Sequence, residues 1–489
     1  MSRLSLKRFI YLSEIDSISS EVTNKYEGCV SNSLVENVER LKNTFPHAPD
    51  LVIRKIKKHN DTEYTLIYLS ELSDKDIIQN NILQPLIKQI NSPLNDINVN
   101  ISEISLVEKW SEVQSAILEG DSILFISDKP YAYQLGTKGW PQRDTSNPQN
   151  EISIKGAHQG FVETAAKNIA MIRRYVPNKN LIIKSIKIGA KENTNLYILY
   201  IEDLINPELL IELNSKLNKI EIDCLINAGE LTKYLENSPL SPFPQLLLTE
   251  RPDFASAQIM KGRFLIVVDR SPNVLIGPTN FTLFFQSNDD TSTKKIISFF
   301  IKMLRIAAFF LALLLPAFYI ALISFNFSLI PVPLFLSIAE SRENVPFSAI
   351  IEALIMEITL EMMREASLRL PSPISQTMGI VGGIIIGQAA VQAGIVSNIM
   401  IIVVSITAIA SFTIPNYDMS LSVRYLRFPM MLLASLFGIV GMAIGLMSLF
   451  AHIISINSFG TTYGDLFYDF KNIQLKKFVR EVLRKYKKS

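Results

Sequence analysis

FSAIIEALIMEITLEMMREASLRL, residues 347–370, lies in the most apolar part of the chain and still carries four glutamates, Glu352, Glu357, Glu361 and Glu365. A helix turns about 100° per residue, so the last three glutamates, spaced i, i+4 and i+8, lie on one face. Carboxylates are costly at bilayer depth, where they normally face protein, water or an ion pathway. The position of this helix therefore decides how the surrounding region folds and what it does.

The segments around this acidic helix predict a multi-pass transmembrane helical domain over residues 303–456. Long apolar stretches, able to cross about 30 Å of hydrocarbon, cover residues 304–326, 378–397, 398–414 and 429–456. SLIPVPLFLSIAES follows the first stretch and is too short and too rich in proline to cross. We interpret it as a re-entrant or interfacial amphipathic segment. The domain has five spans if the acidic helix crosses and four if it does not.

The charges that flank this domain leave its topology open. Lys294, Lys295, Lys302 and Arg305 place the start of the first span on the cytoplasmic side. The basic tail, residues 457–489, also indicates a cytoplasmic position, and two inside ends require an even number of spans. The tail either lies on anionic lipid or forms a solvated helix.

A repeated pattern in the N-terminal half predicts two tandem α/β subdomains that arose by duplication, over residues 51–140 and 178–285. LVIRKIKKHNDTEYTLIYLSEL and LIIKSIKIGAKENTNLYILYIEDL each show two β-branched, aromatic strands around a polar turn, and a helical pattern follows. Further along, ILEGDSILFISDKPYAYQLG and IMKGRFLIVVDRSPNVLIG again correspond. The fold class is therefore α+β, with two cytoplasmic subdomains before an α-helical membrane domain.

The remaining segments are an N-terminal helical segment (1–50), a linker and helix (141–177) and a second linker (286–302). The chain has 489 residues, a net charge of +2 and two cysteines. These numbers give no argument for nucleic acid, a disulfide framework, a metal or another cofactor. No signal-peptide core is present, so we expect the N-terminal region in the cytoplasm. No catalytic constellation is found, and we expect no enzyme.

Several long blocks, in order, resemble the A subunit of the GerA family of spore germinant receptors. In the membrane half they are LLLPAFYIALISF, SIAESRENVPFSAIIEALIMEITLEMMREASLRLP, GIVGGIIIGQAAVQAGIVS and SFTIPNYDMSLSVRYLRF. In the soluble half they are EISIKGAHQGFVETAAKNIAMIRR and ERPDFASAQIMKGRFLIVVDRSP. Lys155, Ala157, Arg270 and Ser367 depart from the family pattern, which usually has Arg, Pro, Gly and often Gly there.

The resemblance implies a multi-pass protein of the spore inner membrane. It implies a complex with a transporter-like B subunit, taken to bind the nutrient, and a lipoprotein C subunit. The A subunit would form a homo-oligomeric ring and pass ions when nutrient binds. Release of monovalent cations and germination would follow.

The acidic helix supplies the candidate site. In a ring, Glu357, Glu361 and Glu365 would form carboxylate layers that favour cations, and Arg364 would pair with an acidic residue to hold a closed state. Glu352 is a further candidate pore-lining or gating residue. The alternative is an interfacial helix with its carboxylates in headgroup water. Glu163, Arg173 and Arg174 are candidate subunit contacts, or else a solvated helix face.

Two other functions stay open at this point. Discontinuous helices and small-residue packing also suit a nutrient-binding or transporter-type protein. A scaffold that relays the signal without conducting ions is the second.

Overall fold

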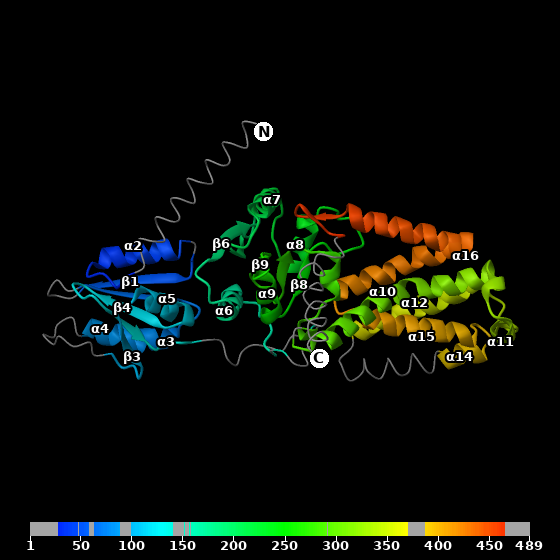
Figure 1. Ribbon diagram of the computed structural model, residues 1–489, viewed down its shortest axis with the longest axis horizontal. Helices are drawn as coiled ribbons and strands as arrows, with labels where there is room; N and C mark the ends of the chain where they lie inside the picture. Colours follow the sequence, from blue (N-terminus) through cyan, green and yellow to red (C-terminus); the bar gives the residue numbers. More distant parts are fainter. Residues whose placement is uncertain are drawn as a thin grey trace, which may run out of the picture. The chain divides into compact units, whose positions relative to one another are not determined.

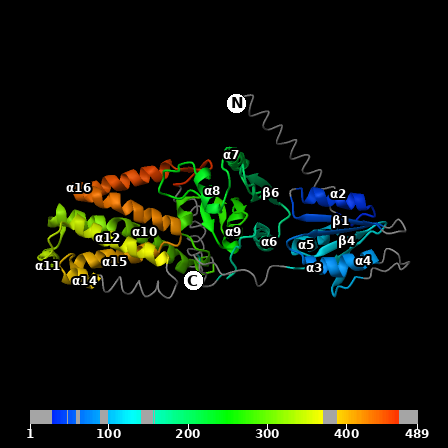
Figure 2. The same cartoon turned by 180° about the vertical axis from the view of Figure 1, so that it is seen from behind.

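The computed structural model describes residues 28–46, 48–57, 63–88, 99–139, 151, 156, 158–290, 292–369 and 387–464. The chain divides into two compact units, and each is described by itself (Figure 1, Figure 2). The first unit holds residues 1–152, 157–234 and 248–276, and the second holds residues 153–156, 235–247 and 277–489. The basic tail beyond residue 464 lies outside the described residues.

The first sheet of the first unit has the strand order β1-β2-β4-β5-β3, with every neighbouring pair antiparallel. Its strands are β1 (Leu51–Lys57), β2 (Glu63–Leu69), β3 (Ile104–Val107), β4 (Ser122–Ile126) and β5 (Ala132–Leu135). Successive side chains point to opposite faces of a strand, so Leu66 and Ile67 enter different cores. The predicted helix in SNSLVENVERLKNTF is confirmed as α2 (Leu34–Thr44).

Helices cover both faces of this sheet. Helices α2 and α5 (Trp110–Glu119) pack on one face, where Leu41 and Val113 are fully buried with Phe125. The continuous helical run α3 (Lys75–Ile77), the π-helical η1 (Ile78–Leu83) and α4 (Gln84–Lys88) pack on the other. The region is therefore an α/β layer structure, as the sequence predicts.

The second sheet repeats the arrangement of the first. Its order is β6-β7-β9-β10-β8, which corresponds strand for strand to the first sheet. Gly120 and Gly262 precede the third strand of each order with positive φ of 95° and 81°. Asp128 and Arg270 follow that strand at φ 62° and 67°. The second sheet is built from β6 (Leu181–Ile188), β7 (Thr194–Ile201), β8 (Leu247–Thr249), β9 (Phe264–Val268) and β10 (Val274–Gly277), with α7 (Pro207–Leu217), α8 (Ala228–Leu235) and α9 (Pro252–Ile259).

Helix α6 (Ala165–Tyr175) joins the two sheets. Ala170 is part of the core under the first sheet, and the helix also contacts α9 and β9 of the second. The Arg173 side chain is 2% exposed and forms an ion pair with Asp50, with Nε 2.8 Å from Oδ2. The prediction that Arg173 makes a subunit contact is therefore wrong, because its guanidinium is buried inside its own chain.

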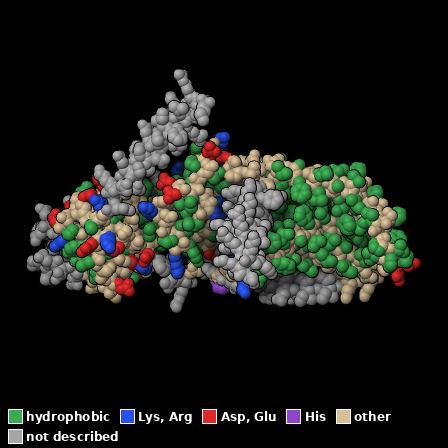
Figure 3. All heavy atoms as spheres, in the orientation of Figure 1, with side chains coloured by type: hydrophobic (Ala, Val, Ile, Leu, Met, Phe, Trp, Pro, Cys, Tyr) green, Lys and Arg blue, Asp and Glu red, His purple; other side chains and the backbone are tan. Residues whose placement is uncertain are grey.

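The second unit is a bundle of apolar helices. They are α10 (Lys295–Ser324), α11 (Val332–Arg342), α12 (Ala349–Leu368), α14 (Gly387–Gln392), α15 (Asn398–Phe412) and α16 (Tyr417–Ser455). Among the described residues, α10 and α16 are long and apolar enough to cross a membrane by length and composition. Figure 3 shows hydrophobic side chains over the visible face of this bundle.

Helix α16 is a hairpin of two arms rather than one span. Gly438 has φ 59° and ψ −139°, a conformation that glycine adopts without a Cβ clash, and it reverses the chain between residues 417–437 and 439–455. A Cβ at Gly441 would lie 2.1 Å from the Leu433 carbonyl oxygen of the other arm. Residues 429–456, predicted as one span, therefore contain a reversal of the chain at Gly438.

The helix directions follow from the contacts between their ends. Arg364 near the end of α12 reaches Ser411 near the end of α15, and Glu352 near the start of α12 contacts Ser397 at the start of α15, so these two helices are parallel. Phe309, midway along α10, packs on Phe281, which also packs on Tyr463 beyond α16. Gly438, between the α16 arms, lies against Phe325 at the end of α10, so the second arm returns the chain toward the half of α10 that begins at Lys295. Residues 370–386 lie outside the described residues.

Replacement of the buried arginine between the sheets gives a first prediction. Arg173→Ala leaves the Asp50 carboxylate buried without its ion-pair partner, so the free energy of unfolding should fall by about 3–5 kcal/mol. The free energy of unfolding is measured by urea unfolding of the full-length chain in detergent. Trp110 fluorescence reports unfolding in a Trp140→Phe background. Arg174→Ala, at an exposed side chain, should cost under about 1 kcal/mol. Equal losses for the two variants would contradict the inference.

The carboxyl of Glu151 gives a second prediction, for pH dependence. Burial raises the pKa of Glu151 to about 7, although its Oε2 accepts hydrogen bonds from the Thr249 hydroxyl and the Glu250 amide. A raised pKa favours the protonated form in the fold, so stability is complete below about pH 4.5 and declines as pH rises to about 7. The loss is about 3 kcal/mol at most. Glu151→Gln should remove this slope in urea unfolding followed by far-UV circular dichroism, and an unchanged slope would assign it to another group.

The close approach of the α16 arms gives a third prediction. Gly441→Ala places a methyl group against the Leu433 carbonyl, which is backbone and cannot rotate away. Overpacking of this kind costs about 3 kcal/mol, and the variant should show a lower midpoint of thermal unfolding in detergent. Gly387→Ala is the control, because its Cβ would meet only the Ile401 side chain at an ordinary 3.7 Å. A Gly441 variant as stable as the control would mean that the arms are not tightly packed.

Candidate functional site

Each glutamate of α12 is paired with an arginine of the same chain. We call this set the charged seam: Glu352 with Arg342, Glu357 with Arg427, Glu361 with Arg424 and Glu365 with Arg369. The partners come from α11, from the first arm of α16 and from the end of α12 itself. The seam runs along α12 from the interior of the bundle to its surface.

Glu352 is fully buried and ties four helices together. Its carboxylate accepts hydrogen bonds from Arg342 Nη1 at 2.8 Å and from the Ser397 amide at 2.5 Å. Ser397 caps α15 by accepting from the Met400 amide, and its hydroxyl contacts the Tyr319 hydroxyl of α10 at 3.2 Å. Because the buried carboxylate is both paired and hydrogen-bonded, we assign Glu352 to the fixing of these helix starts.

Glu357 and Arg427 form a buried ion pair between α12 and α16. Their side chains are 3% and 5% exposed, and Arg427 Nη1 donates to Glu357 Oε2. Arg427 Nε also donates to the Ala312 carbonyl of α10 at 2.8 Å. Removing one partner of such a pair leaves a buried charge, so α10, α12 and α16 depend on each other here.

Glu361 and Arg424 form the next pair, half exposed. Arg424 Nη1 donates to Glu361 Oε1 at 2.6 Å, and the two side chains are 6% and 42% exposed. Arg364 was expected to pair with an acidic side chain, but it donates to the Ser411 hydroxyl at 3.1 Å and lies over the Phe412 ring. It faces α15, whereas Arg424 and Arg427, the partners of Glu361 and Glu357, project from α16.

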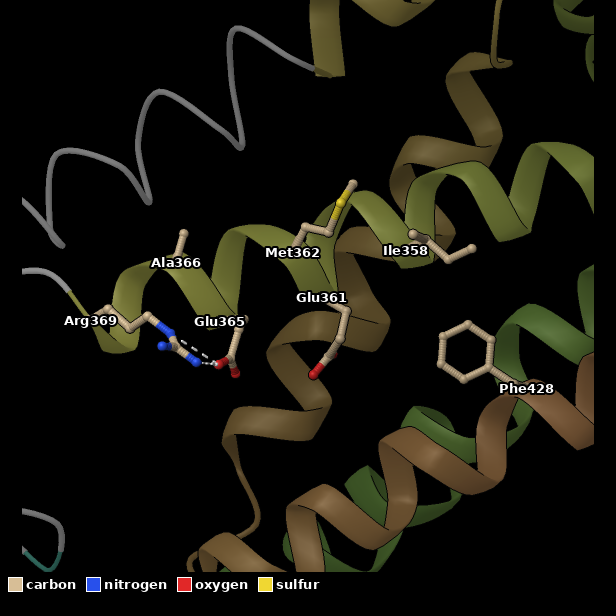
Figure 4. Close-up of a pocket in the computed structure, with 7 residues that line it drawn as sticks. All are labelled: Ile358, Glu361, Met362, Glu365, Ala366, Arg369 and Phe428. Carbon is tan, nitrogen blue, oxygen red and sulfur yellow. Dashed lines mark hydrogen bonds and ion pairs between the residues drawn. The ribbon is translucent and has the colours of Figure 1, made fainter.

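The surface end of the seam borders an open groove of about 570 Å³. Glu365 and Arg369 pair at 2.7 Å across one helical turn and are both exposed. Phe428 of α16 lies across the groove from the α12 side chains (Figure 4). The groove is lined by Ile358, Glu361, Met362, Glu365, Ala366, Arg369 and Phe428.

The charge of the seam differs from what the glutamates alone indicate. Four carboxylates lie beside five arginines: Arg342, Arg364, Arg369, Arg424 and Arg427. In this conformation the seam is therefore not a negatively charged surface. Glu357 is buried, so it lines no open face of a single chain, whereas Glu361 and Glu365 are accessible.

Arg424 and Arg427 are the residues that sequence reasoning missed. They lie three apart in RYLRFP, within an apolar stretch, so they share a helix face that complements glutamates spaced four apart. Two arginines in such a stretch are themselves a signal, because they need partners at that depth.

The other predicted contact residues lie in the first unit. Glu163 is exposed, and its backbone carbonyl accepts from the Arg270 amide, while Arg174 is exposed on α6. Arg270, where the family pattern has glycine, adopts left-handed φ and pairs with Glu192 at 2.7 Å. Within the described ranges, His, Cys, Asp and Glu form no group of three that could hold a metal ion.

Comparisons with known proteins cover most of the chain. The uncharacterized membrane protein YfkQ of Bacillus subtilis (strain 168) is 38% identical over 94% of this chain and 91% of its own length. Spore germination protein KA of the same organism is 36% identical, over 89% of this chain and 81% of that protein. Spore germination protein A1, also of that strain, is 38% identical, over 85% and 86%.

A solved structure and a family description complete the comparison. The crystal structure of the N-terminal domain of the A subunit of the Bacillus megaterium spore germinant receptor GerK3 is 25% identical and covers 52% of this chain and 98% of that chain, with a TM-score of 0.41. Residues 39–489 match the family described as Bacillus/Clostridium GerA spore germination protein. The chain therefore belongs to the GerA family of spore germination proteins.

Proposed function

We propose that this chain is the A subunit of a nutrient germinant receptor, an oligomeric membrane subunit that turns nutrient binding into release of monovalent cations. Membership of the GerA family supports the germination role. The name of one relative as a membrane protein, and two helices with the length and composition of spans, support the inner spore membrane. A transporter-like B subunit, a lipoprotein C subunit and surrounding lipid are the proposed partners.

The topology within this proposal follows from the ends of the bundle. The second arm of α16 returns the chain toward the half of α10 that begins at Lys295, so we place both ends of the bundle on one side, which requires an even number of crossings. Residues 417–437 and 439–455 of α16 are separate arms and count as two passes. We place the first unit in the cytoplasm, because Lys294 precedes α10 and Lys295 begins it. The matching strand orders of its two sheets support an origin by duplication.

The pairing of the α12 carboxylates with the α16 arginines is the observation that carries the mechanism. Carboxylate rings attract cations only when their charge is free, and here Arg424 and Arg427 neutralise Glu361 and Glu357. The described conformation thus corresponds to a closed state. Opening requires α16 to release the half-exposed Glu361 first, because the Glu357 pair is buried and costs more to break.

In a ring, the accessible Glu361 and Glu365 of each copy would face a shared aqueous path. Both line the open groove, and the exposed Glu365–Arg369 pair needs water or protein around it. A non-conducting scaffold is the second candidate function, favoured by the pairing of all four seam carboxylates with arginines.

The fourth prediction tests conduction with the assembled receptor complex in liposomes loaded with potassium. Arg424→Gln leaves Glu361 without its partner, which weakens the closed state. A half-exposed pair is worth up to about 1 kcal/mol, so the basal potassium leak should rise up to about fivefold. Glu361→Gln should raise the leak and also lower the preference for potassium over chloride, because a carboxylate of the path is lost.

Arg369→Gln is the matched control, since its pair is exposed at the helix end and should change the leak by less than about twofold. A leak in the wild-type complex that ignores both Arg424→Gln and Glu361→Gln would place the path elsewhere. No flux from an assembled complex would favour the scaffold.

A further inference from the structure

A proline-rich segment of the second unit contacts both arms of the α16 hairpin. We call residues 235–247 the strap; they join α8 to β8 along the chain, yet they pack in the second unit. Pro239, Pro242 and Pro244 fix the backbone φ at three of these positions, which makes the strap stiff. A stiff segment transmits a displacement to the helix that it contacts better than a flexible loop does.

The strap binds the first arm at Ser422 and the second at His452. The Ser422 hydroxyl contacts both the Pro242 carbonyl and the Asp418 carbonyl of its own helix, and the Ser241 hydroxyl is 2.9 Å from His452 Nε2. Phe243 is 1% exposed and its ring lies 6.2 Å from the His452 ring. Two adjacent strap residues therefore contact the α16 hairpin: Pro242 contacts the first arm and Ser241 contacts the second.

Gln245 closes the strap on itself and anchors it. Its side-chain oxygen accepts from the Asn237 and Ser238 amides at 3.0 and 3.1 Å, and its Nε2 donates to the Ser238 carbonyl. Its backbone carbonyl accepts from the hydroxyls of Ser458, in β11 (Asn457–Ser458), and Thr279, which follows β10. Gln245 is 1% exposed, so these bonds are shielded from water.

Ser422 lies two residues before Arg424 and five before Arg427 on one continuous helical arm. A helix rises about 1.5 Å per residue and is stiff over one or two turns, so an axial shift at Ser422 reaches both arginines. These arginines hold Glu361 and Glu357 of α12. The contacts form one route from the strap through α16 to the charged seam.

We propose that the strap positions the first arm of α16 and thereby sets whether Arg424 and Arg427 engage α12. Ser241, Pro242 and Ser422 are positioning residues in this scheme, since they act through the arginines. The inference rests on the proposed function only for its consequence, the opening of a cation path.

The test measures the register of α12 against α16 by thiol cross-linking of the full-length chain in lipid vesicles. Cys29 and Cys224 are replaced by serine, and the reporter pair is Ile358→Cys with Phe428→Cys, which line the groove from α12 and from α16 and leave every ion pair of the seam in place. A short bifunctional thiol reagent joins the two, and the rate of cross-linked product is followed on gels. A second reporter, Phe327→Cys with Phe335→Cys, monitors the opposite end of the bundle, where these rings lie 6.2 Å apart.

Ser422→Ala is the principal variant, because it removes the bond to Pro242. It should slow cross-linking of the 358–428 reporter about fivefold, the factor for one lost hydrogen bond, and leave the 327–335 reporter unchanged. Ser435→Ala is the matched control: this exposed hydroxyl on the same arm donates to the Leu432 carbonyl of its own helix. Ser241→Ala, on the other contact, should act in the same direction if Ser422→Ala does not fold.

Unchanged cross-linking in both strap variants would overturn the proposal. Equal slowing of both reporters would also overturn it, since the strap would then be a general brace of the bundle. The vesicles with the assembled complex report potassium flux in parallel. Altered cross-linking without any wild-type flux would support the strap and refute conduction, whereas flux with unaltered cross-linking would do the reverse.

Discussion

The buried ion pair between Glu357 and Arg427 is the constraint on which the helical unit depends. Neither side chain reaches bulk water, and each would be an uncompensated charge among apolar helices without the other. Arg427 also binds the Ala312 carbonyl, so α10, α12 and α16 meet at one point. The groove, the accessible Glu361 and the arms of α16 are all placed relative to that contact.

Two glycine-dependent features let the second unit form around this pair. Gly438 reverses the chain between the arms of α16. Gly441 has no Cβ, so the Leu433 carbonyl of the other arm can lie where a methyl group would otherwise be. The hairpin returns the chain toward the half of α10 that begins at Lys295. There the second arm contacts the strap through His452, and Tyr463 packs on Phe281. A straight helix would have carried His452 away from Ser241.

The sequence predicted the alternating strands and the repeated strand pattern well, because these follow from local periodicity. It failed where long-range partners decide. Glu357 lies on the predicted face of α12 with Glu361, yet it is buried because α16 covers that part of the face. Arg173 lies in a sequence that is typical of an exposed helix face, but its side chain is buried because it forms an ion pair with Asp50, far away in the chain. Gly438 lies within a predicted span, because small residues are also common in packed helices. Periodicity alone does not reveal that the chain reverses there.

The separation of Glu357 and Arg427 along the chain has a consequence for biosynthesis. The arginine is encoded 70 residues after the glutamate. At about 5–20 residues per second, a ribosome needs roughly 4–14 s to make the partner after Glu357 has emerged. During that interval the Glu357 carboxyl has no ion-pair partner, and a charged carboxylate among apolar helices is costly. The α16 hairpin therefore completes the bundle after the other described helices have been made.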